Sequence, residues 1–375
     1  IIFYLNLIIL LIFINILKII SGYYKYLIME LQDFITNTDN YLQELKKHNI
    51  YIHKKKDLAL VKTHYNREYD YNTYPWMRFC RGAIIDLKTD KLLCIPPSKS
   101  SDIIDINNIN KEGTYDMLVD GTMINMFYHD EKWDISSRSN IGCKNSWDGK
   151  LSFLDMFHEV SNDIQYNKDL KKNCCYSFVL QHSKNRIVSP LWENKIIFVQ
   201  QYNLDTMERV DLDELYHIEK IPKLHYNDYN INLHYGIKGL TFYKDGVRYK
   251  WINPNYKYVT SLKMNHNDKF LNYSELRKKH LLKEYLVYFP EDSHQFTEYQ
   301  RKYYLIKNHL YDCYVKHFIK KELELKDINY SLKPHLFKLH DFYKTTNQKI
   351  NSNIVNDYVH ELDGKQIMFI CNYLF

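Results

Sequence analysis

The chain has 375 residues, a formal net charge of +6 at pH 7 and a pI near 8.6. This length accommodates two domains of ordinary size, and the mild positive charge fits an anionic partner such as nucleic acid without singling one out. The seven cysteines form no Cys-x-x-Cys pair and follow no regular spacing, which argues against a disulfide framework and a zinc site. We therefore interpret them as reduced thiols of an intracellular protein.

The first segment, residues 1–20, is almost wholly apolar and long enough to span a bilayer. The chain does not begin with Met, however, and Met29 opens a sequence typical of the start of a soluble protein. We interpret residues 1–28 as translated upstream sequence, with an N-terminal anchor or signal segment as the alternative. A membrane is an expected partner only if residues 1–20 are real, because nothing later resembles a transmembrane helix.

The rest of the chain changes character twice. Apolar residues at helical spacing predict a helix over residues 30–50, and short β-rich runs separated by turn residues follow as far as residue 263. A single helix near residues 151–162 interrupts those runs, whereas the pattern from about residue 270 onward is helical and charged. The sequence therefore predicts an α+β protein, with an antiparallel β-rich core in residues 29–263 and an all-α domain in residues 264–375. The predicted strands are residues 58–63, 82–87, 92–95, 115–128, 133–136, 176–181, 196–202, 239–243 and 247–251.

One segment stands out, Tyr115-Asp-Met-Leu-Val-Asp-Gly-Thr-Met-Ile-Asn-Met-Phe127. It reads as strand, turn and strand, with Asp120 and Gly121 at the turn. An Asp-Gly pair is also a common hairpin turn, so this segment alone does not identify a site.

Further segments in a fixed order give the turn its context. They are Phe79-Cys-Arg-Gly-Ala-Ile-Ile-Asp86, Trp133-Asp-Ile-Ser-Ser-Arg-Ser-Asn-Ile-Gly142, Tyr176-Ser-Phe-Val-Leu-Gln-His-Ser-Lys-Asn-Arg-Ile-Val188, Ile196-Ile-Phe-Val-Gln-Gln-Tyr-Asn203, Gly236-Ile-Lys-Gly-Leu-Thr-Phe242 and Arg248-Tyr-Lys-Trp-Ile-Asn-Pro-Asn-Tyr256. Together, over about residues 78–260, they resemble the phage RNA ligase 1 family, the ATP-dependent tRNA-repair type of covalent nucleotidyltransferase. The Asn-Arg-Ile-Val run that ends at residue 188 is the most specific match.

The resemblance implies a fold, a reaction and a set of ligands. The fold is an ATP-grasp-like ligase core. In the family, a lysine attacks the α-phosphate of ATP, and the AMP then passes to an RNA 5′-phosphate before the 3′-hydroxyl displaces it. ATP and Mg²⁺ are the implied cofactors, and RNA, including tRNA-like RNA, is the implied partner of the basic cleft and the helical domain. The implied nucleotide-binding residues are Arg81, Gly82, Asp120, Gly121, Arg138 and Lys250, and Arg186 is the implied RNA contact.

The chain departs from the family where the chemistry is performed. Leu118 occupies the position of the nucleophilic lysine, and the two expected glutamates align with Val179 and Lys238. Ile252 replaces the second lysine of the last strand. Loss of a nucleophile alone costs many orders of magnitude in rate, and loss of both acids removes the expected metal and ribose ligands, so we predict no metal site.

Three lysines are candidate substitutes for the nucleophile. Lys111 precedes the turn, Lys132 lies in the next predicted hairpin, and Lys238 would face the same pocket from the opposite strand. A displaced amine is a poor substitute, because the reaction tolerates little change in geometry.

Three hypotheses follow. The first is a catalytically degenerate ligase-like protein, a pseudoenzyme that binds ATP, RNA or both. The second is an active ATP-dependent RNA ligase that uses a displaced lysine, and the third is a viral structural or interaction protein whose old pocket is filled by Leu118 and Val179. Abundant Tyr, Ile, Lys and Asn beside scarce Gly resemble translation from an AT-rich genome, as in some large DNA viruses. We therefore expect the host cytoplasm or a viral replication compartment.

Overall fold

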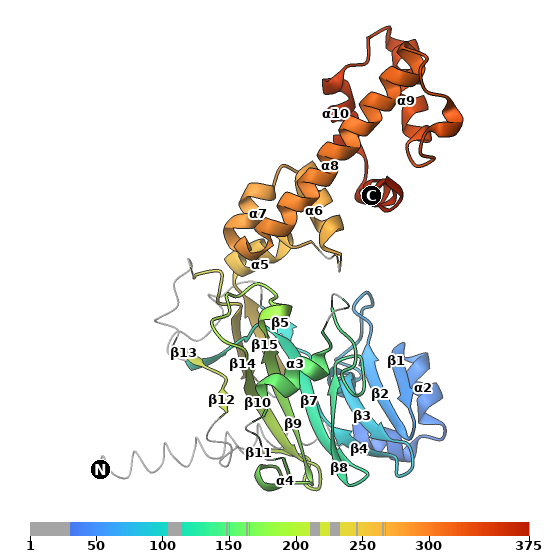
Figure 1. Ribbon diagram of the computed structural model, residues 1–375. Helices are drawn as coiled ribbons and strands as arrows, with labels where there is room; N and C mark the ends of the chain where they lie inside the picture. The colour runs from blue at the N-terminus through green and yellow to red at the C-terminus, as the bar shows by residue number, and fades with distance from the viewer. Residues whose placement is uncertain are drawn as a thin grey trace. The chain divides into compact units, whose positions relative to one another are not determined.

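The computed structural model describes residues 31–103, 114–147, 149, 151–162, 164, 166–210, 218–225, 233–244, 247–264, 266 and 268–374. The chain divides into two compact units, Ile1–Lys257 and Tyr258–Phe375 (Figure 1). The predicted boundary at residues 263/264 falls just after this division. Residues 1–28 lie outside the described ranges, and within those ranges no helix is both long and apolar enough to cross a membrane.

The first sheet of the N-terminal unit is antiparallel, in the order β1-β2-β3-β4. Its strands are β1 (Ile50–Lys55), β2 (Leu58–Thr63), β3 (Arg81–Asp86) and β4 (Lys91–Cys94). The central strands are apolar on both faces because both faces are covered. Residues 31–37 are helical and pack with α2 (Tyr41–Lys47) on the core, and residues of the second sheet join the same core. A 3₁₀ turn, Pro75–Phe79, leads into β3.

The second sheet has the order β11-β10-β9-β7-β8, with β12 parallel to β10. Its strands are β7 (Thr122–His129), β8 (Lys132–Ser137), β9 (Cys174–Gln181), β10 (Lys195–Asn203), β11 (Glu208–Val210) and β12 (Glu219–Lys220). The predicted helix is present as α3 (Phe153–Val160), where Ser152 and Asp155 form a capping box. Phe153 and Phe157 of this helix pack with Phe178 and Phe198 of the sheet, and Figure 1 shows α3 lying across these strands. The short α4 (Tyr166–Asp169) precedes β9, and a 3₁₀ turn, Ser183–Asn185, follows it.

The third sheet has the order β13-β6-β14-β15-β5. Its strands are β5 (Ser101–Asp102), β6 (Thr114–Met117), β13 (Lys223–His225), β14 (Gly239–Lys244) and β15 (Val247–Ile252). Tyr115, Leu240 and Trp251 form its apolar core with Leu233. The sheet thus assembles strands that are far apart in the sequence around β6, which directly precedes the Asp120 turn.

The segment over residues 115–128 is not a hairpin. It does contain two strands, but β6 pairs with β13 and β14 whereas β7 pairs with β8 and β9. Asp120 and Gly121 therefore carry the chain from one sheet to another. Gly121 has a φ of 152°, and a Cβ atom there would lie 2.5 Å from both the Leu180 carbonyl oxygen and Val179 Cγ1, so the crossing requires glycine.

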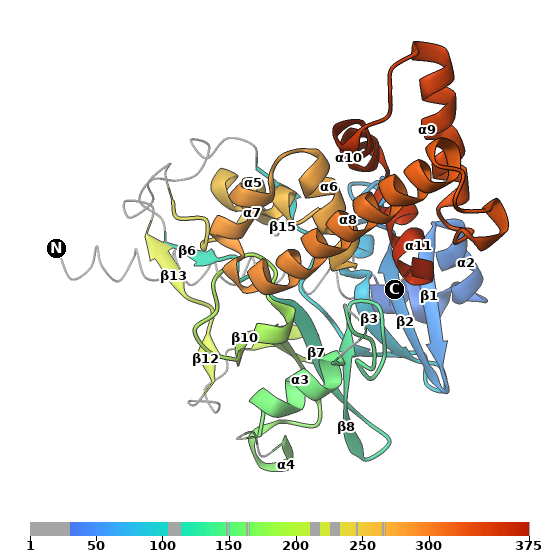
Figure 2. The same ribbon diagram turned by 45° about the horizontal axis from the view of Figure 1, so that its top comes forward.

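The C-terminal unit is helical, as predicted. It contains α6 (Lys269–Lys278), α7 (Leu282–Tyr288), α8 (Ser293–Tyr314), α9 (Lys333–Thr346), α10 (Ser352–Glu361) and α11 (Gly364–Leu374), and α5 (Pro254–Leu262) leads into it (Figure 2). A 3₁₀ turn, Pro290–Asp292, separates α7 from α8, a π-helical turn, Val315–Ile319, ends α8, and a 3₁₀ turn, Leu325–Asp327, precedes α9. Pro290 and Pro334 both stand at helix starts, which agrees with the breaks read from the sequence.

Candidate functional site

Six cationic side chains gather at one place in the N-terminal unit, and we call them the basic cluster. They come from strands β2, β3 and β15, from the end of β8 and from the segment before β5. Arg138 and Arg248 lie close enough to Arg81 for their charges to lower its pKa. Arg81, Arg138 and Lys250 act in the same way on the pKa of Lys99. The members are Lys62, Arg81, Lys99, Arg138, Arg248 and Lys250.

Backbone geometry holds three of these cations together. Lys62 and Arg81 are direct partners in the antiparallel pairing of β2 with β3. Gly82 has a φ of 105°, and a Cβ atom there would lie 3.0 Å from the Arg138 Cα atom, so its small size permits that close approach. Arg138 Nη2 then donates to the Thr63 carbonyl oxygen at 3.4 Å. The Arg-Gly pair of the sequence thus serves to bring a second arginine against the first.

Among the described residues, the charges in and around the basic cluster are mostly positive. Burial, with the charges of Arg138 and Arg248, lowers the pKa of Arg81 to about 10, and Tyr71 offsets this only in part. Burial and Arg138 likewise lower the pKa of Lys62. Lys250 has an ion-pair partner, Asp102 at 3.1 Å, but this carboxylate is 67% exposed. Crowded, partly desolvated cations are stabilised by an opposite charge, and a phosphate group supplies one.

One polar atom in the basic cluster lacks a protein partner. Among the residues that the structure describes, the Arg138 Nε atom is buried and has no hydrogen-bond acceptor. Buried donors are normally paired, because an unmade hydrogen bond costs about 1–3 kcal/mol. Arg138 therefore offers an N–H group that a bound oxyanion can accept from.

Asp120, by contrast, has a full set of partners. Its Oδ2 atom accepts from the backbone N–H groups of Val188 and Ser189 at 2.9 and 3.0 Å. Its Oδ1 atom accepts from the Tyr256 hydroxyl at 2.6 Å and from Lys238 Nζ at 3.1 Å. Burial alone raises the pKa of this carboxyl group, but the Lys238 charge and the three hydrogen bonds outweigh it and hold the pKa below its ordinary value. Asp120 therefore ties three distant segments to the crossing between sheets.

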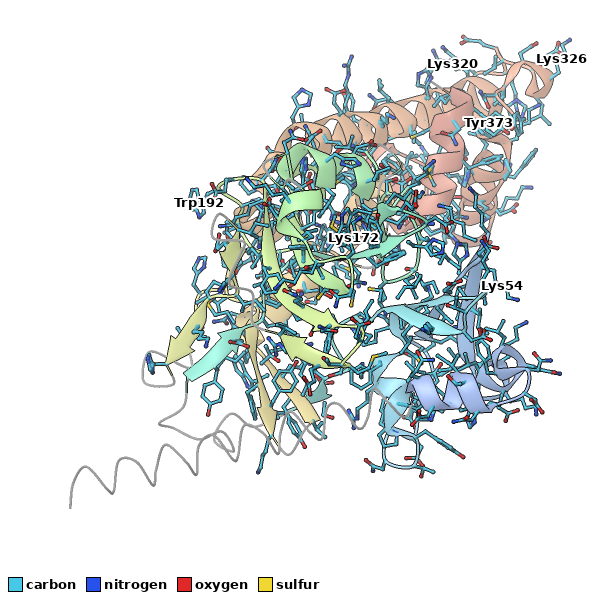
Figure 3. All side chains as sticks on the ribbon, turned by 90° about the horizontal axis from the view of Figure 1, so that it is seen from below. Lys54, Lys172, Trp192, Lys320, Lys326 and Tyr373 are labelled. Carbon is cyan, nitrogen blue, oxygen red and sulfur yellow. The ribbon has the colours of Figure 1, made fainter. Side chains whose placement is uncertain are left out.

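A cavity of about 230 Å³ lies beside this turn, and Leu118 and Lys238 both line it. Leu118 is fixed by its backbone N–H, which donates to the Gly239 carbonyl oxygen at 2.8 Å. Trp192, Glu193 and Glu219 also line this cavity. Trp192 is 96% exposed, and Figure 3 shows it standing away from the ribbon.

The candidate substitute lysines occupy different settings. Lys238 forms an ion pair with Asp120 at 3.1 Å, and its Nζ atom lies 5.6 Å from the centre of the Tyr256 ring. Lys132 is exposed on β8 and pairs with Asp134 at 3.3 Å. Lys111 lies outside the described residues.

Arg186 and its neighbour shape the loop between β9 and β10. Arg186 donates from Nε and Nη2 to the Val188 carbonyl oxygen at 3.2 and 2.9 Å, and from Nε to the Ser189 carbonyl oxygen at 3.2 Å. Asn185 donates to the Thr122 hydroxyl at 2.9 Å. These bonds present the two backbone N–H groups that Asp120 accepts from.

The residues expected to form one nucleotide site thus lie in two groups. Arg81, Gly82, Arg138 and Lys250 belong to the basic cluster, whereas Asp120 and Gly121 form the turn, and no member of the cluster lines the cavity at the turn. Lys62, Lys99 and Arg248 were not predicted from the sequence. The position of Arg248 two residues before Lys250 was the available signal, whereas Lys62 and Lys99 carried none.

The described residues do not fit a divalent metal ion. No group of three or more His, Cys, Asp or Glu side chains gathers among them. Both carboxylate oxygens of Asp120 are occupied by protein donors, and the family's glutamate positions hold Val179 and the cation Lys238. Hard oxygen ligands are what Mg²⁺ requires, so we derive no step through a metal.

Comparisons with known proteins found similar solved structures that are described as ligases. No protein-family model matches this chain, and no curated protein does. Among solved structures it is similar to a protein described as an ATP-dependent DNA ligase from Aquifex aeolicus, with a TM-score of 0.40, 14% identity and alignment over 69% of this chain and 75% of that one. It is also similar to Naegleria gruberi RNA ligase with PPi, with a TM-score of 0.29, 13% identity and alignment over 44% of this chain and 59% of that one, less than two thirds of its length. It is similar as well to a mutant of the Naegleria gruberi RNA ligase with ATP and Mn. The TM-score is 0.32 and the identity is 12%, and the alignment covers 58% of this chain and 82% of that one.

These solved neighbours are DNA and RNA ligases. All three TM-scores lie below 0.5, so we base the function on the residues and contacts of this chain alone.

Proposed function

We propose that this chain is a ligase-like nucleotidyltransferase that has lost covalent catalysis and binds the phosphates of ATP or RNA through the basic cluster. The observation that carries the proposal is the crowding of Arg81, Arg138 and Lys99, with lowered pKa values for Arg81 and Lys99 and a buried, unpaired Nε on Arg138, in the described part of the chain. The resemblance to phage RNA ligase 1 supplies ATP and RNA as the ligands to test, and a large DNA virus as the expected source.

The basic cluster suits phosphate better than a carboxylate-bearing metabolite. A terminal phosphate has three free oxygens that accept from several donors at once, and the phosphodiester of RNA has two. Arginine presents its N–H groups in a planar fork that matches them. Burial and the repulsion from Arg138 and Arg248 lower the pKa of Arg81, and a bound phosphate relieves the repulsion. Binding therefore gains free energy beyond that of the new contacts. Such binding depends strongly on salt, because each neutralised phosphate releases counterions.

The residues at the Asp120 turn argue against a covalent intermediate. Adduct formation requires a free amine beside the α-phosphate and, in this family, a metal ion to balance charge. Leu118 supplies no amine, and the described carboxylates offer no metal site. The chain therefore retains the means to hold phosphate without the means to attack it.

The adduct is tested directly. The full chain is incubated with ATP labelled at the α-phosphate, with Mg²⁺ or Mn²⁺, and resolved on a denaturing gel beside an active RNA ligase. We expect label on the active ligase and none on this chain. A labelled band on this chain would refute the loss of catalysis.

The binding half of the proposal needs a separate measurement. Fluorescence anisotropy with a labelled single-stranded RNA, repeated at several salt concentrations and with ATP as competitor, gives the affinity and its salt slope. We expect Arg138→Gln to weaken binding by about tenfold or more and to reduce the salt slope by roughly 0.7. Lys172→Gln is the matched control, because Lys172 is an exposed lysine of the same unit that lies over Tyr128, outside the cluster (Figure 3). Equal losses of RNA affinity in both variants would show that the effect comes from the net charge of the protein and not from the basic cluster.

One observation favours the second hypothesis, an active ligase with a displaced lysine. Lys238 lines the same cavity as Leu118, so its amine lies in the neighbourhood of the missing nucleophile. If the labelled band appears, Lys238→Ala should abolish it while Lys132→Ala leaves it unchanged.

A further inference from the structure

The helical unit contains a cavity of about 410 Å³ that the proposed function does not use. It lies between α6, α7, α8 and α10, which Figure 2 shows within that unit. α8 contributes residues 293, 296, 297, 300, 303, 304 and 307, which follow helical spacing and form one stripe. A volume of this size is in the range of small-molecule sites.

Charge in this cavity has one sign. Among the described residues that line it, Arg277, Lys283 and Lys307 are cationic and none carries a carboxylate. Arg277 Nη1 donates to His360 Nδ1 at 2.8 Å, which orients the guanidinium. Burial and the Arg277 charge lower the pKa of His360, so the imidazole stays a neutral acceptor near neutral pH. The cavity therefore presents a fixed positive charge with two lysines around it.

Aromatic rings form much of its remaining surface. Tyr273, Phe296 and Tyr303 are buried and belong to the core of the unit, whereas Tyr304 is 58% exposed. The Lys307 Nζ atom lies 5.1 Å from the centre of the Tyr304 ring, and the Arg277 Cζ atom lies 4.4 Å from that of Tyr303. An exposed ring beside a lysine offers a planar ligand a stacking surface and its phosphate a cation.

We propose that this cavity binds a nucleoside phosphate, with the phosphate at Lys283 and Lys307 and the base against Tyr304. Three cations without a carboxylate select an anion, and the ring adjacent to them selects one that carries a planar aromatic group. A free nucleotide and a nucleotide of a single-stranded RNA share this chemistry. The site is independent of the basic cluster, which is built from other residues in the N-terminal unit.

Isothermal titration calorimetry on the full chain separates these sources. The ligands are AMP, inorganic phosphate and a short single-stranded RNA, and Arg138→Gln serves as the background so that the basic cluster contributes little. We expect saturable binding of AMP that is tighter than binding of phosphate. RNA binding that is tighter than AMP binding and is lost when Lys283 and Lys307 are both changed to Gln would identify a strand as the natural source. The reverse order of affinities would identify free nucleotide.

Matched variants assign the binding to the cavity. Lys283→Gln combined with Lys307→Gln should weaken AMP binding by about tenfold or more. Lys320→Gln combined with Lys326→Gln removes the same charge from exposed lysines of the same unit that do not line the cavity, and should leave it unchanged (Figure 3). Tyr304→Leu should abolish the preference for AMP over phosphate. Absence of saturable AMP binding, or equal losses in the two double variants, would overturn the proposal.

Discussion

The Asp120 turn and the basic cluster both place charged groups out of water, but they treat the charge in opposite ways. At the turn, one carboxylate has four donors, including the backbone N–H groups of Val188 and Ser189. In the basic cluster, six cations crowd together. Among the described residues, one of these cations, Lys250, has an ion-pair partner, which is Asp102. A satisfied charge holds a fold together, whereas unsatisfied charge is retained at a cost and is typical of a site that awaits a ligand.

This difference decides which residues of the ligase resemblance still point to function. Asp120 and Gly121 match the family's motif, yet their contacts explain them as structural. Among the described residues, Arg138 donates to the Thr63 carbonyl oxygen and Lys250 pairs with Asp102. Neither these two side chains nor Arg81 is paired as fully as Asp120. The comparison is sharpened or broken by measuring stability and binding in the same variants.

The largest effect is expected at the turn. Asp120→Ala leaves Lys238, Tyr256 and two backbone donors without their acceptor, so we expect the free energy of unfolding to fall by about 3–5 kcal/mol. Urea unfolding followed by circular dichroism measures this fall. An Asp120→Ala variant as stable as the native protein would mean that the carboxylate is retained for a ligand.

Gly121→Ala should lower the free energy of unfolding by somewhat less, about 3 kcal/mol. The new methyl group would lie 2.5 Å from the Leu180 carbonyl oxygen, and the backbone there has a φ of 152°. Gly149→Ala is the control, since Gly149 also has a positive φ, 78°, but no atom within 4 Å of the new Cβ. We expect about 1 kcal/mol there from conformation alone. Equal costs at the two positions would remove the argument for a close approach between the turn and β9.

The basic cluster should respond in the opposite direction. Arg81→Gln removes a cation whose pKa is lowered to about 10 by burial and by its neighbours. We therefore expect the free energy of unfolding to rise by roughly 1 kcal/mol while RNA affinity falls by about tenfold. Lys172→Gln should change neither quantity. Loss of stability and binding together would make Arg81 a structural residue like Asp120.

The predictable part of the fold came from strands that carry their own pattern. β2, β9 and β14 have long apolar or alternating runs, and their bounds were close to the predicted ones. β5 and β12 are two-residue strands with polar sequences, so only their neighbours define them. The crossing at Asp120 was also beyond local reasoning, because an Asp-Gly pair looks the same whether its flanking strands pair with each other or with distant partners.

The candidate site divides in the same way. Arg81, Arg138 and Lys250 were found because motif residues travel with the resemblance. Lys62 and Lys99 were missed because their membership depends on pairing between strands and on where the chain returns, which no local pattern records. Asp120 was found, but its four donors come from positions 188, 189, 238 and 256, so its structural role required the tertiary contacts.

The smallest of the expected effects is a difference in how stability depends on pH. Acid should lower the stability provided by the turn but not that of the basic cluster. The pKa of Asp120 in the fold is lower than its ordinary value of 3.8, so the unfolded chain takes up a proton first as the pH falls. The stability that this difference provides is complete above the unfolded pKa and is lost as the pH falls through the folded pKa. Asp120→Asn cannot titrate, so its unfolding midpoint in urea should fall less steeply than that of the native protein as the pH is lowered from about 5 to about 2. Other carboxylates titrate equally in both proteins and cancel in the comparison. Arg81→Gln should keep the native slope, because the cations of the cluster remain protonated throughout this range. Parallel curves for the native protein and Asp120→Asn would show that the pKa of Asp120 is the same in the folded and unfolded chains.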